Sequence, residues 1–427
     1  MIDIKLIREN KELVKENIKK KFQDEKIDLV DEIYLLDINY RKTKTEADES
    51  RSKVNTLSKE IGTLMRDKNI DAANKIKKEV AKIKELIPEL EQKEEKLEKE
   101  IKEKMMVIPN IIADDVPIGD DDSKNVELEK FGEPIIPEYE IPYHADILES
   151  INGLDKESSG RTSGNGFYYL MGDAARLSSA MLSYARDFMI DKGFIYCIPP
   201  FMIRSDVVTG VMSFKEMDAM MYKIEGEDLY LIGTSEHSMI GKFKDQLLKE
   251  ENLPYNLTSY SPCFRKEVGA HGIEERGIYR VHQFEKQEMI VICKPEESMD
   301  WYEKMWKYTV ELFRNLNIPV RTLECCSGDL ADLKVKSCDV EAWSPRQQKY
   351  FEVGSCSTLG DAQSRRLGIR VKGENGYYYP HTLNNTVLAS TRALIAFLEN
   401  NLNEDGSINI PEALRPYMGG KEKLERK

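Results

Sequence analysis

The chain has 427 residues, which is enough for two or three domains of about 150 residues each. Hydrophobic residues make up 41% of it, which excludes wholesale disorder, and charged residues make up 33%, so one region should be a charged, solvated element. The net charge of −13 argues against a protein that holds nucleic acid by bulk charge, although a local basic face is compatible with it.

The first 105 residues contain one proline, Pro88, and one glycine, Gly62, and are rich in Lys, Glu, Leu and Ile, which predicts helix. Apolar or small residues recur there at alternating spacings of four and three. They do so at Leu36, Tyr40, Thr43, Ala47, Ser50, Val54, Leu57, Ile61 and Leu64, and again at Ile76, Val80, Ile83, Ile87, Leu90, Leu97 and Ile101. This heptad spacing is typical of coiled coils. A turn near residues 68–70 pairs positions whose numbers sum to 137, so we expect an antiparallel coiled-coil hairpin.

The outer half of this arm differs in charge from the rest of the chain. Residues 41–90 carry 13 Lys or Arg against 9 Asp or Glu, a net charge of +4. Such a run is usually only a solvated face. A basic arm on an acidic protein also suits a polyanion such as RNA, bound at a distance from the main body.

Residues 106–145 hold five prolines and the acidic run Asp120 to Asp122, which predicts a connector laid over a surface. From about residue 165 the pattern becomes mixed, with helices expected at 173–192 and 386–401 and a strand leading into Pro199. Further strand-like runs occur at Tyr230–Ile232, Leu257–Tyr260, Ile278–Phe284, Met289–Cys293, Val340–Trp343, Lys349–Val353 and Leu367–Val371. Because strands and helices do not alternate regularly, we expect an antiparallel sheet of the α+β class. The sequence has no G-x-G-x-x-G motif and no P-loop.

No apolar run approaches the ~18 residues of a membrane span, and the first residues lack the apolar core of a signal peptide. The seven cysteines form no Cys-x-x-Cys pair and lie at positions 197, 263, 293, 325, 326, 338 and 356. This pattern indicates reduced thiols in a cytoplasmic protein, without a disulfide framework. The adjacent Cys325 and Cys326 leave a partial metal site as an alternative.

The densest polar segment lies on a strand expected over residues 278–288. Because strand residues alternate between faces, one face carries the even-numbered side chains Arg280, His282, Phe284, Lys286 and Glu288. Such a face belongs either to a solvated edge strand or to a ligand-binding floor, where a ring stacks on a base and Arg meets phosphate.

Three further clusters are weak signals when taken singly. Thr234-Ser235-Glu236-His237 has the pattern of a helix N-cap, and Glu352 with Ser355 offers oxygens suited to Mg²⁺. Asn384-Asn385-Thr386 precedes an apolar helix that carries Arg392. None of the three defines a reaction by itself.

Together these segments resemble the seryl-tRNA synthetase family of class II aminoacyl-tRNA synthetases, over essentially the whole chain. Class II motif 1 resembles residues 176–200, motif 2 residues 261–288, and motif 3 residues 382–400. The hairpin resembles the tRNA-binding arm of this family. The resemblance implies an N-terminal tRNA-binding arm at 1–108 and a class II catalytic domain at 109–427. The Asn-Asn-Thr start of motif 3 is closer to archaeal and eukaryotic members than to bacterial ones.

The resemblance also implies roles. Arg265 would hold the α-phosphate and the serine carboxylate, Phe284 would stack under adenine, and Arg392 would stack over adenine or meet the γ-phosphate. Arg265 and Arg392 would be the catalytic residues. The ATP-binding residues would be Arg265, Lys266, Glu267, Val281, Phe284, Glu352, Val353, Gly354, Ser355 and Arg392. The serine-binding residues would be Thr234, Ser235, Glu236, Glu288 and Thr386, and Glu352 and Ser355 would ligate Mg²⁺.

The activity implied is that of an ATP-dependent serine–tRNA ligase, a homodimer that charges tRNA(Ser); charging of tRNA(Sec) stays open. Some positions depart from the family: His237 stands where Gln or Val is usual, Gly354 where Ser is usual, and the motif 2 loop at 272–276 lacks an expected Arg. Two alternatives are a noncatalytic RNA-binding paralogue and a ligase that loads amino acids onto a carrier protein. The intact charged set argues against the first, and the arm argues against the second.

Overall fold

The computed structural model describes residues 1–267 and 276–426. The chain forms two compact units, Ile2–Pro109 and Asn110–Lys427. Most of the motif 2 loop noted above, residues 272–275, lies outside the described residues. None of the helices in the described part combines the length and the apolar composition needed to cross a bilayer.

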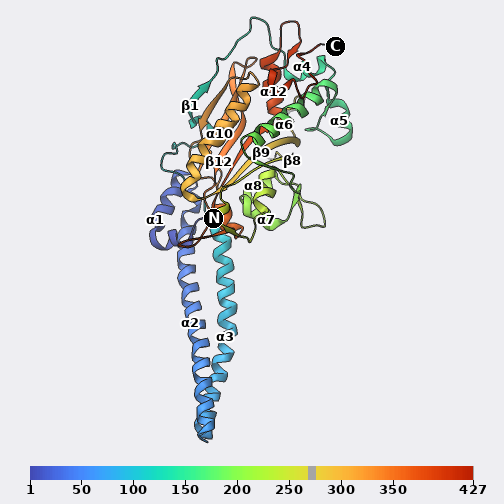
Figure 1. Ribbon diagram of the computed structural model, residues 1–427. Helices are drawn as coiled ribbons and strands as arrows, with labels where there is room; N and C mark the ends of the chain where they lie inside the picture. Colours follow the sequence, from blue (N-terminus) through green and yellow to red (C-terminus); the bar gives the residue numbers. More distant parts are fainter. Residues whose placement is uncertain (268–275, 427) are drawn as a thin grey trace. The chain divides into compact units, whose positions relative to one another are not determined.

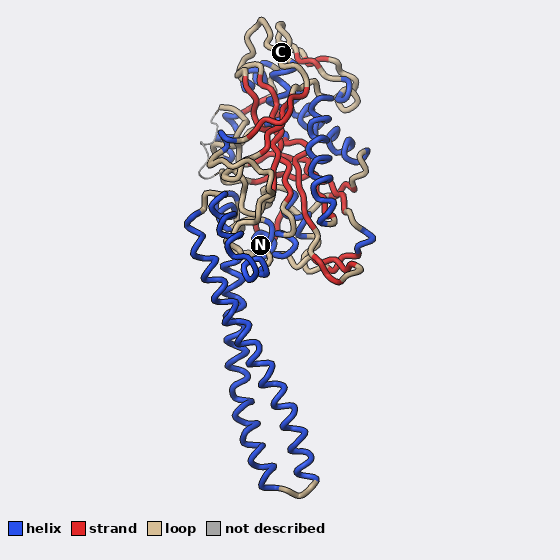
Figure 2. The backbone as a smooth tube through the Cα atoms, turned by 90° about the vertical axis from the view of Figure 1, so that its left-hand side faces the viewer, coloured by secondary structure: helices blue, strands red, loops and turns tan. Residues whose placement is uncertain are grey.

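The first unit is helical and confirms the predicted hairpin. It comprises α1 (Ile4–Lys20), a 3₁₀ turn (Asp24–Lys26), α2 (Ile27–Arg66) and α3 (Ile70–Met105). Figure 2 shows α2 and α3 running side by side. The seam residues Thr43, Ala47, Val80 and Leu90 are buried between them.

Ion pairs across the hairpin join residues in antiparallel order. Lys44 pairs with Glu94 at 3.5 Å, Arg51 with Glu91 at 2.8 Å, and Lys53 with Glu79 at 2.6 Å. Exposed pairs of this kind contribute little to stability. The buried seam therefore holds the arm together, and the ion pairs mainly favour its register.

An eight-stranded sheet forms the centre of the second unit, in the order β1-β10-β11-β12-β15-β9-β8-β4. All neighbours are antiparallel except β4 and β8, which are parallel. This confirms the expected α+β class. The strands are β1 (Val126–Phe131), β4 (Ile195–Cys197), β8 (Tyr255–Phe264), β9 (Gln283–Cys293), β10 (Val320–Glu324), β11 (Lys336–Ser344), β12 (Lys349–Thr358) and β15 (His381–Ala389).

Short strands form four small sheets: β2 (Leu154–Asp155) with β3 (Tyr169–Leu170), β5 (Met202–Ile203) with β6 (Tyr230–Leu231), β7 (Leu247–Lys249) with β13 (Arg370–Gly373) and β14 (Gly376–Tyr378), and β16 (Ile408–Asn409) with β17 (Lys423–Leu424). The helices of this unit are α4 (His144–Ser150), α5 (Lys156–Ser163), α6 (Gly172–Asp191), α7 (Ser205–Val211), α8 (Phe214–Met220), α9 (Ser235–Gly241), α10 (Ser298–Asn315), α11 (Ala362–Arg366) and α12 (Ser390–Asn401).

The two faces of β9 have different roles. Its odd-numbered residues Met289, Val291 and Cys293 belong to the large core, which also contains apolar residues of α6, α10 and α12 (Figure 1). Its even-numbered residues Ile290 and Ile292 pack in a second cluster with residues of α9. The sheet is therefore covered on both faces along this part of β9.

Strands β12 and β15 pair at Cys356 with Asn385, Ser357 with Asn384, and Thr358 with Leu383. These pairs lie towards one end of the two strands. Beyond them, Glu352 to Gly354 on β12 and Thr386 and Ala389 on β15 line a cavity. The cavity thus lies where β12 and β15 are no longer paired.

The structure corrects three boundaries. The helix predicted over 386–401 begins only at Ser390, because residues 381–389 form strand β15. This strand lies between β9 and β12 and is largely buried, although five of its nine residues are polar, so it lacks the alternation that reveals a half-exposed strand. The runs at 278–284 and 289–293 are not two strands: β9 is continuous from Gln283 to Cys293 and starts later than expected. Leu367 follows helix α11, and β13 starts at Arg370.

Candidate active site

Two cavities open on the face of the sheet that carries the even-numbered side chains of β9. The first has a volume of about 130 Å³ and is lined by residues of β9, β12, β15 and α12 together with residues 265, 267 and 279–281. The second has a volume of about 340 Å³ and adds residues of α8, α9 and the segment 325–339. Arg265, Lys286, Glu352 and Thr386 line both, so the two cavities share one wall.

The first cavity combines aromatic surfaces with paired charges. The guanidinium carbon of Arg265 lies 5.3 Å from the ring centroid of Phe284, and that of Arg392 lies 4.8 Å from the centroid of Tyr279. Arg280 donates to Glu267 at 2.7 Å. Val281, Val353 and Gly354 complete the lining near these groups. A flat, anionic ligand matches this combination of rings and cations.

Arg392, which lines the first cavity, forms an ion pair with Glu352, which lines both. Arg392 donates to the Glu352 carboxylate at 2.8 Å and to its backbone carbonyl at 3.2 Å. Desolvation opposes ionisation of Glu352, but the guanidinium of Arg392 outweighs it and holds the pKa of Glu352 below its usual value. Glu352 is thus a carboxylate at neutral pH.

The second cavity contains a cluster of buried carboxylates. Lys286 forms an ion pair with Glu288, and the Thr234 hydroxyl donates to Glu288 at 3.3 Å. Gln363 donates to Glu236 at 2.8 Å. Burial, aided by the charge of Glu288, raises the pKa of Glu236 to about 7.

A network of hydroxyls lies at the far side of this cavity. The Lys334 ammonium donates to the Ser337 hydroxyl at 3.2 Å, and Ser337 lies 3.2 Å from the hydroxyl of Ser355. Burial, together with the charge of Glu352, raises the pKa of Asp339 to about 7. Burial alone would lower the pKa of Lys334, but the carboxylates around it, Asp339 foremost, raise it. Lys334 is therefore a fixed positive charge in an acidic pocket.

Two of the residues proposed from the sequence do not line either cavity. Ser235 is fully buried, and its hydroxyl accepts a hydrogen bond from Ser259 at 2.6 Å. Lys266 donates its backbone N–H to the carbonyl of Met220 at 2.9 Å. The other thirteen residues proposed for ATP, serine or metal line one cavity or both: Thr234, Glu236, Arg265, Glu267, Val281, Phe284, Glu288, Glu352, Val353, Gly354, Ser355, Thr386 and Arg392.

The two adjacent cysteines have different surroundings. The thiol of Cys326 donates to the carbonyl of Asp121 at 3.0 Å. The thiol of Cys325 lies with the carboxylates of Asp329 and Asp339, their ligand atoms within 4.8 Å of one another. Cys325 and Cys326 therefore do not point at a common site.

Several residues that line the cavities are not among the site residues predicted from the sequence. One of them, Lys286, belongs to the even-numbered face of the strand, and this position is a signal that it lines the site. Glu216, Asp329, Lys334 and Asp339 come from segments without a recognisable pattern, and only the folding of the chain brings them to the cavity.

Comparison with known proteins defines the class of this site. The family model "tRNA synthetase class II core domain (G, H, P, S and T)" matches residues 220–401, which include the first cavity and most of the second. The model "Seryl-tRNA synthetase N-terminal domain" matches residues 1–112. The domain that contains these cavities is thus similar to the core domain of class II aminoacyl-tRNA synthetases.

Proteins that are similar over the whole chain identify the family within this class. The serine–tRNA ligase of Methanoculleus marisnigri is 38% identical and that of Thermococcus sibiricus 41% identical, over 99% of this chain and 100% and 98% of theirs. The crystal structure of seryl-tRNA synthetase from Pyrococcus horikoshii complexed with ATP is 39% identical, with a TM-score of 0.93 and full coverage of both chains. Cytoplasmic serine–tRNA ligase from Naegleria fowleri in complex with AMP is 32% identical, with a TM-score of 0.90 and coverage of 100% and 99%. The chain belongs to the seryl-tRNA synthetase family, which confirms the resemblance seen in its motifs.

The raised pKa of Glu236 predicts a pH-dependent stability. Between about pH 4.5 and pH 7 the folded protein keeps a proton on Glu236 that the unfolded chain releases, so this group makes stability fall as the pH rises through that range. The Gln side chain of Glu236→Gln is neutral at every pH, so the variant does not lose this part of its stability as the pH rises. Urea unfolding should give the variant a growing advantage over wild type from pH 5 to pH 7.5, up to about 3 kcal/mol. Glu227→Gln, at an exposed position, is the control. A difference in stability between Glu236→Gln and wild type that does not change with pH would contradict a raised pKa of Glu236.

Proposed function

We propose that the chain is a serine–tRNA ligase, which joins L-serine and ATP to form seryl-adenylate and pyrophosphate and then transfers serine to the terminal ribose of tRNA(Ser). The observation that carries this proposal is the wall common to the two cavities. A nucleotide in the first cavity and an amino acid in the second meet there, at Arg265. Attack of a carboxylate on the α-phosphate joins two anions, so a cation must neutralise both and hold them in line.

The first cavity is assigned to ATP. Two relatives whose structures contain ATP and AMP support nucleotide binding by this chain. Phe284 is assigned to the adenine ring, Glu267 to its amino group, and Arg392 to the ring or the γ-phosphate, while Val281, Val353 and Gly354 enclose the nucleoside. Lys266 stays a candidate for the phosphates, although its side chain is not part of the cavity lining.

The second cavity is assigned to serine. The amino acid is a zwitterion, and the cavity offers partners for both of its charges: Arg265 and Lys286 for the carboxylate, and Glu288 and Glu236 for the ammonium group. The carboxylate of serine lies towards Arg265, the ammonium group lies towards Glu288, and Thr234 and Thr386 limit the room for larger side chains. A site that hydrogen-bonds a hydroxyl rejects alanine, because its own polar groups would be left unpaired.

Mg²⁺ is assigned to Glu352 and Ser355. Hard cations prefer oxygen ligands, and both residues offer oxygens in the second cavity. Six carboxylate residues line that cavity (Glu216, Glu236, Glu288, Asp329, Asp339 and Glu352) against three cationic ones (Arg265, Lys286 and Lys334), so the residues present fit a divalent cation. When bound, the ion supplies positive charge to the phosphates.

The first unit is assigned to tRNA binding. Its outer half is basic, with a net charge of +4 over residues 41–90, and the family model of the seryl-tRNA synthetase N-terminal domain matches this unit. Electrostatic attraction to a phosphate backbone requires such a surface. The seven cysteines are all free thiols, which supports the proposed location in the cytoplasm.

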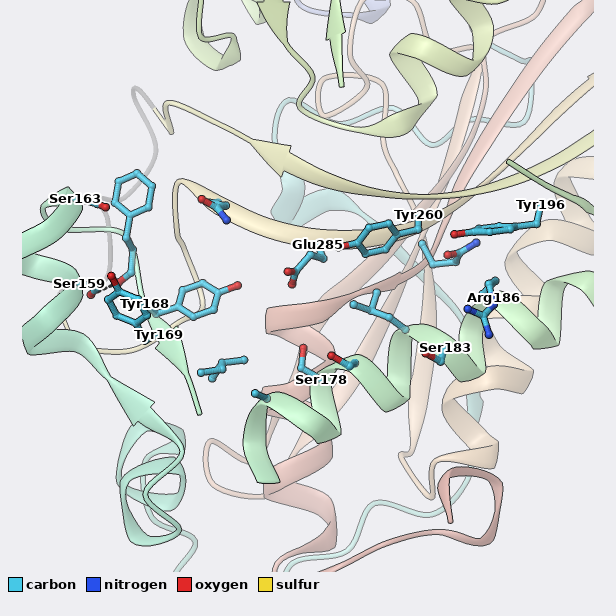
Figure 3. A pocket seen from close by; sticks show the side chains of 17 residues that line it. Ser159, Ser163, Tyr168, Tyr169, Ser178, Ser183, Arg186, Tyr196, Tyr260 and Glu285 are labelled. Carbon is cyan, nitrogen blue, oxygen red and sulfur yellow. Dashed lines mark hydrogen bonds between the residues drawn. The ribbon is translucent and has the colours of Figure 1, made fainter. Parts of the chain in front are cut away.

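The protein is also proposed to be a homodimer, held through the face of the sheet opposite the active site. A cavity of about 640 Å³ lies there, between α6 and the odd-numbered residues Gln283, Glu285 and Gln287 of β9. Figure 3 shows Ser178, Ser183 and Arg186 of α6 along one wall and Tyr260 and Tyr196 along another. The nearby edge strand β4 and its flanks expose Ile190, Ile195, Ile198 and Met202. An edge strand with exposed apolar side chains favours contact with another chain, and motif 1 forms the dimer interface in the family that the sequence resembles.

The activity is tested by serine-dependent exchange of pyrophosphate with ATP, screened over the twenty amino acids. Wild type should respond to serine. Arg265→Lys should lower the exchange rate at least tenfold, ~1.4 kcal/mol of barrier, because Lys cannot contact two anions in the bidentate manner of Arg. Circular dichroism checks that the variant is folded. No exchange by wild type would favour a noncatalytic paralogue, and a folded, fully active Arg265→Lys would remove Arg265 from the phosphate site.

The role of the arm is tested by measuring the two reaction steps separately, namely activation of serine and its transfer to tRNA. Replacement of residues 41–90 by a short turn should abolish transfer of serine to tRNA(Ser) and leave serine-dependent pyrophosphate exchange largely intact. Charging is measured with radiolabelled serine, and exchange is measured on the same preparation. Serine transfer to a carrier protein by the shortened chain would support the carrier-protein ligase, whereas equal loss of both activities would show that the arm is not a separate tRNA-binding element.

The dimer is tested on the two edge strands of the same sheet. Ile195 on β4 is 66% exposed and Leu128 on β1 is 49% exposed. Ile195→Lys should shift the sedimentation coefficient from dimer to monomer, because it places a charge in the apolar contact, whereas Leu128→Lys should leave the dimer intact. The reverse result, or a monomeric wild type, would place the interface elsewhere or exclude it.

A further inference from the structure

His237 lies in the proposed amino acid cavity, and its ring has no hydrogen-bond partner in the part of the chain that the structure describes. It belongs to α9, lines the second cavity and is 4% exposed. Its Nδ1 atom is buried and has no hydrogen-bond partner among the described residues. A buried, unpaired polar atom destabilises a protein, and native structures contain few of them. An apolar side chain of similar size would avoid this loss, so the presence of histidine needs an explanation other than packing.

The surroundings of the ring determine its protonation. Burial, with the charges of Arg265 and Lys286, lowers the pKa of His237 to about 3. The imidazole is therefore neutral at physiological pH and has one N–H donor and one acceptor nitrogen. Because Nδ1 is enclosed by protein, Nε2 is the ring nitrogen that is left to meet a ligand in the cavity.

The position of the ring within the cavity indicates which group it meets. The Cε1 atom of His237 lies 3.6 Å from the place of a Cβ atom on Gly233, and the carbonyl of Gly233 accepts a hydrogen bond from Arg265 at 3.2 Å. The charged groups that act on His237 are both cations, Arg265 and Lys286, and both belong to the wall shared with the nucleotide cavity. An anionic group of the ligand is attracted to this end of the cavity.

We propose that His237 is a substrate-binding residue whose Nε2–H donates a hydrogen bond to the α-carboxylate of the amino acid, as a second donor beside Arg265. This inference rests on the proposed function, because it takes the second cavity to be the serine site. One carboxylate oxygen attacks the α-phosphate, and His237 holds the other, which becomes the carbonyl oxygen of the adenylate. The contact exists before and during the reaction, so it contributes to binding more than to the chemical step.

The test compares an apolar variant with a polar one. In pyrophosphate exchange, His237→Leu should raise the KM for serine at least about tenfold while kcat and the KM for ATP change less than about twofold. His237→Gln keeps an N–H donor and should stay within about threefold of wild type. The melting temperature of His237→Leu without substrates should not fall, because the variant removes an unpaired polar atom. His237→Met carries the same expectations and replaces His237→Leu if that variant does not fold.

Ethanolamine identifies the group that His237 contacts. It has the ammonium and hydroxyl groups of serine and lacks the carboxylate, so it should inhibit wild type and His237→Leu with the same inhibition constant. A weaker inhibition of His237→Leu would place the imidazole at the ammonium or hydroxyl group and overturn the proposal. An unchanged KM for serine in His237→Leu, or a loss in His237→Gln equal to that in His237→Leu, would overturn it as well. Wild-type exchange with serine separates these outcomes from failure of the proposed function itself.

Discussion

The alternation of side chains along strand β9 is the constraint on which the catalytic unit depends. β9 pairs with β8 on one side and with β15 on the other, so its register cannot shift without moving the whole sheet. Phe284, Lys286 and Glu288 therefore face the two cavities, and Gln283, Glu285 and Gln287 face the opposite cavity. One strand thus connects the proposed nucleotide and amino acid sites with the proposed dimer surface.

Burial and ion pairing determine which side chains around this strand are charged. Carboxylates outnumber cations in the amino acid cavity, and an acidic cluster of this kind would repel itself if every member were ionised. Two effects reduce the repulsion: Glu236 and Asp339 have raised pKa values, and Glu352 is paired with Arg392. Two of the three cations, Arg265 and Lys286, lie at the shared wall, where the two anions are proposed to react. In this low-dielectric space a fixed charge acts more strongly than it would in water.

The two units are stabilised in different ways. The arm is a pair of long helices whose buried seam consists of few, partly small side chains, and most of its other residues are solvated. The catalytic unit has a continuous core that joins the sheet to α6, α10 and α12. A rigid core suits a site in which two small ligands must be aligned, and a solvated arm with a basic outer half suits contact with a large polyanion.

The sequence by itself determined the features that depend on neighbouring residues. The heptad spacing predicts the hairpin, because coiled-coil packing repeats every seven residues, and the even-numbered set from Phe284 to Glu288 follows from the two-residue period of a strand. The motifs also identify the family. By contrast, the end of strand β15, residues 386–389, is predicted as the start of a helix, because this largely buried strand does not alternate polar and apolar residues.

Only the tertiary structure decided the features that depend on contacts between distant segments. It turned Ser235 towards Ser259, brought Lys334 and Asp339 to the amino acid cavity, and placed Arg392 against Glu352. It also enclosed His237, which the sequence shows only as a departure from the family, in a pocket where its Nδ1 atom has no partner within the described chain. Burial and charge at each of these positions come from residues remote in the sequence, so no local pattern could have revealed them.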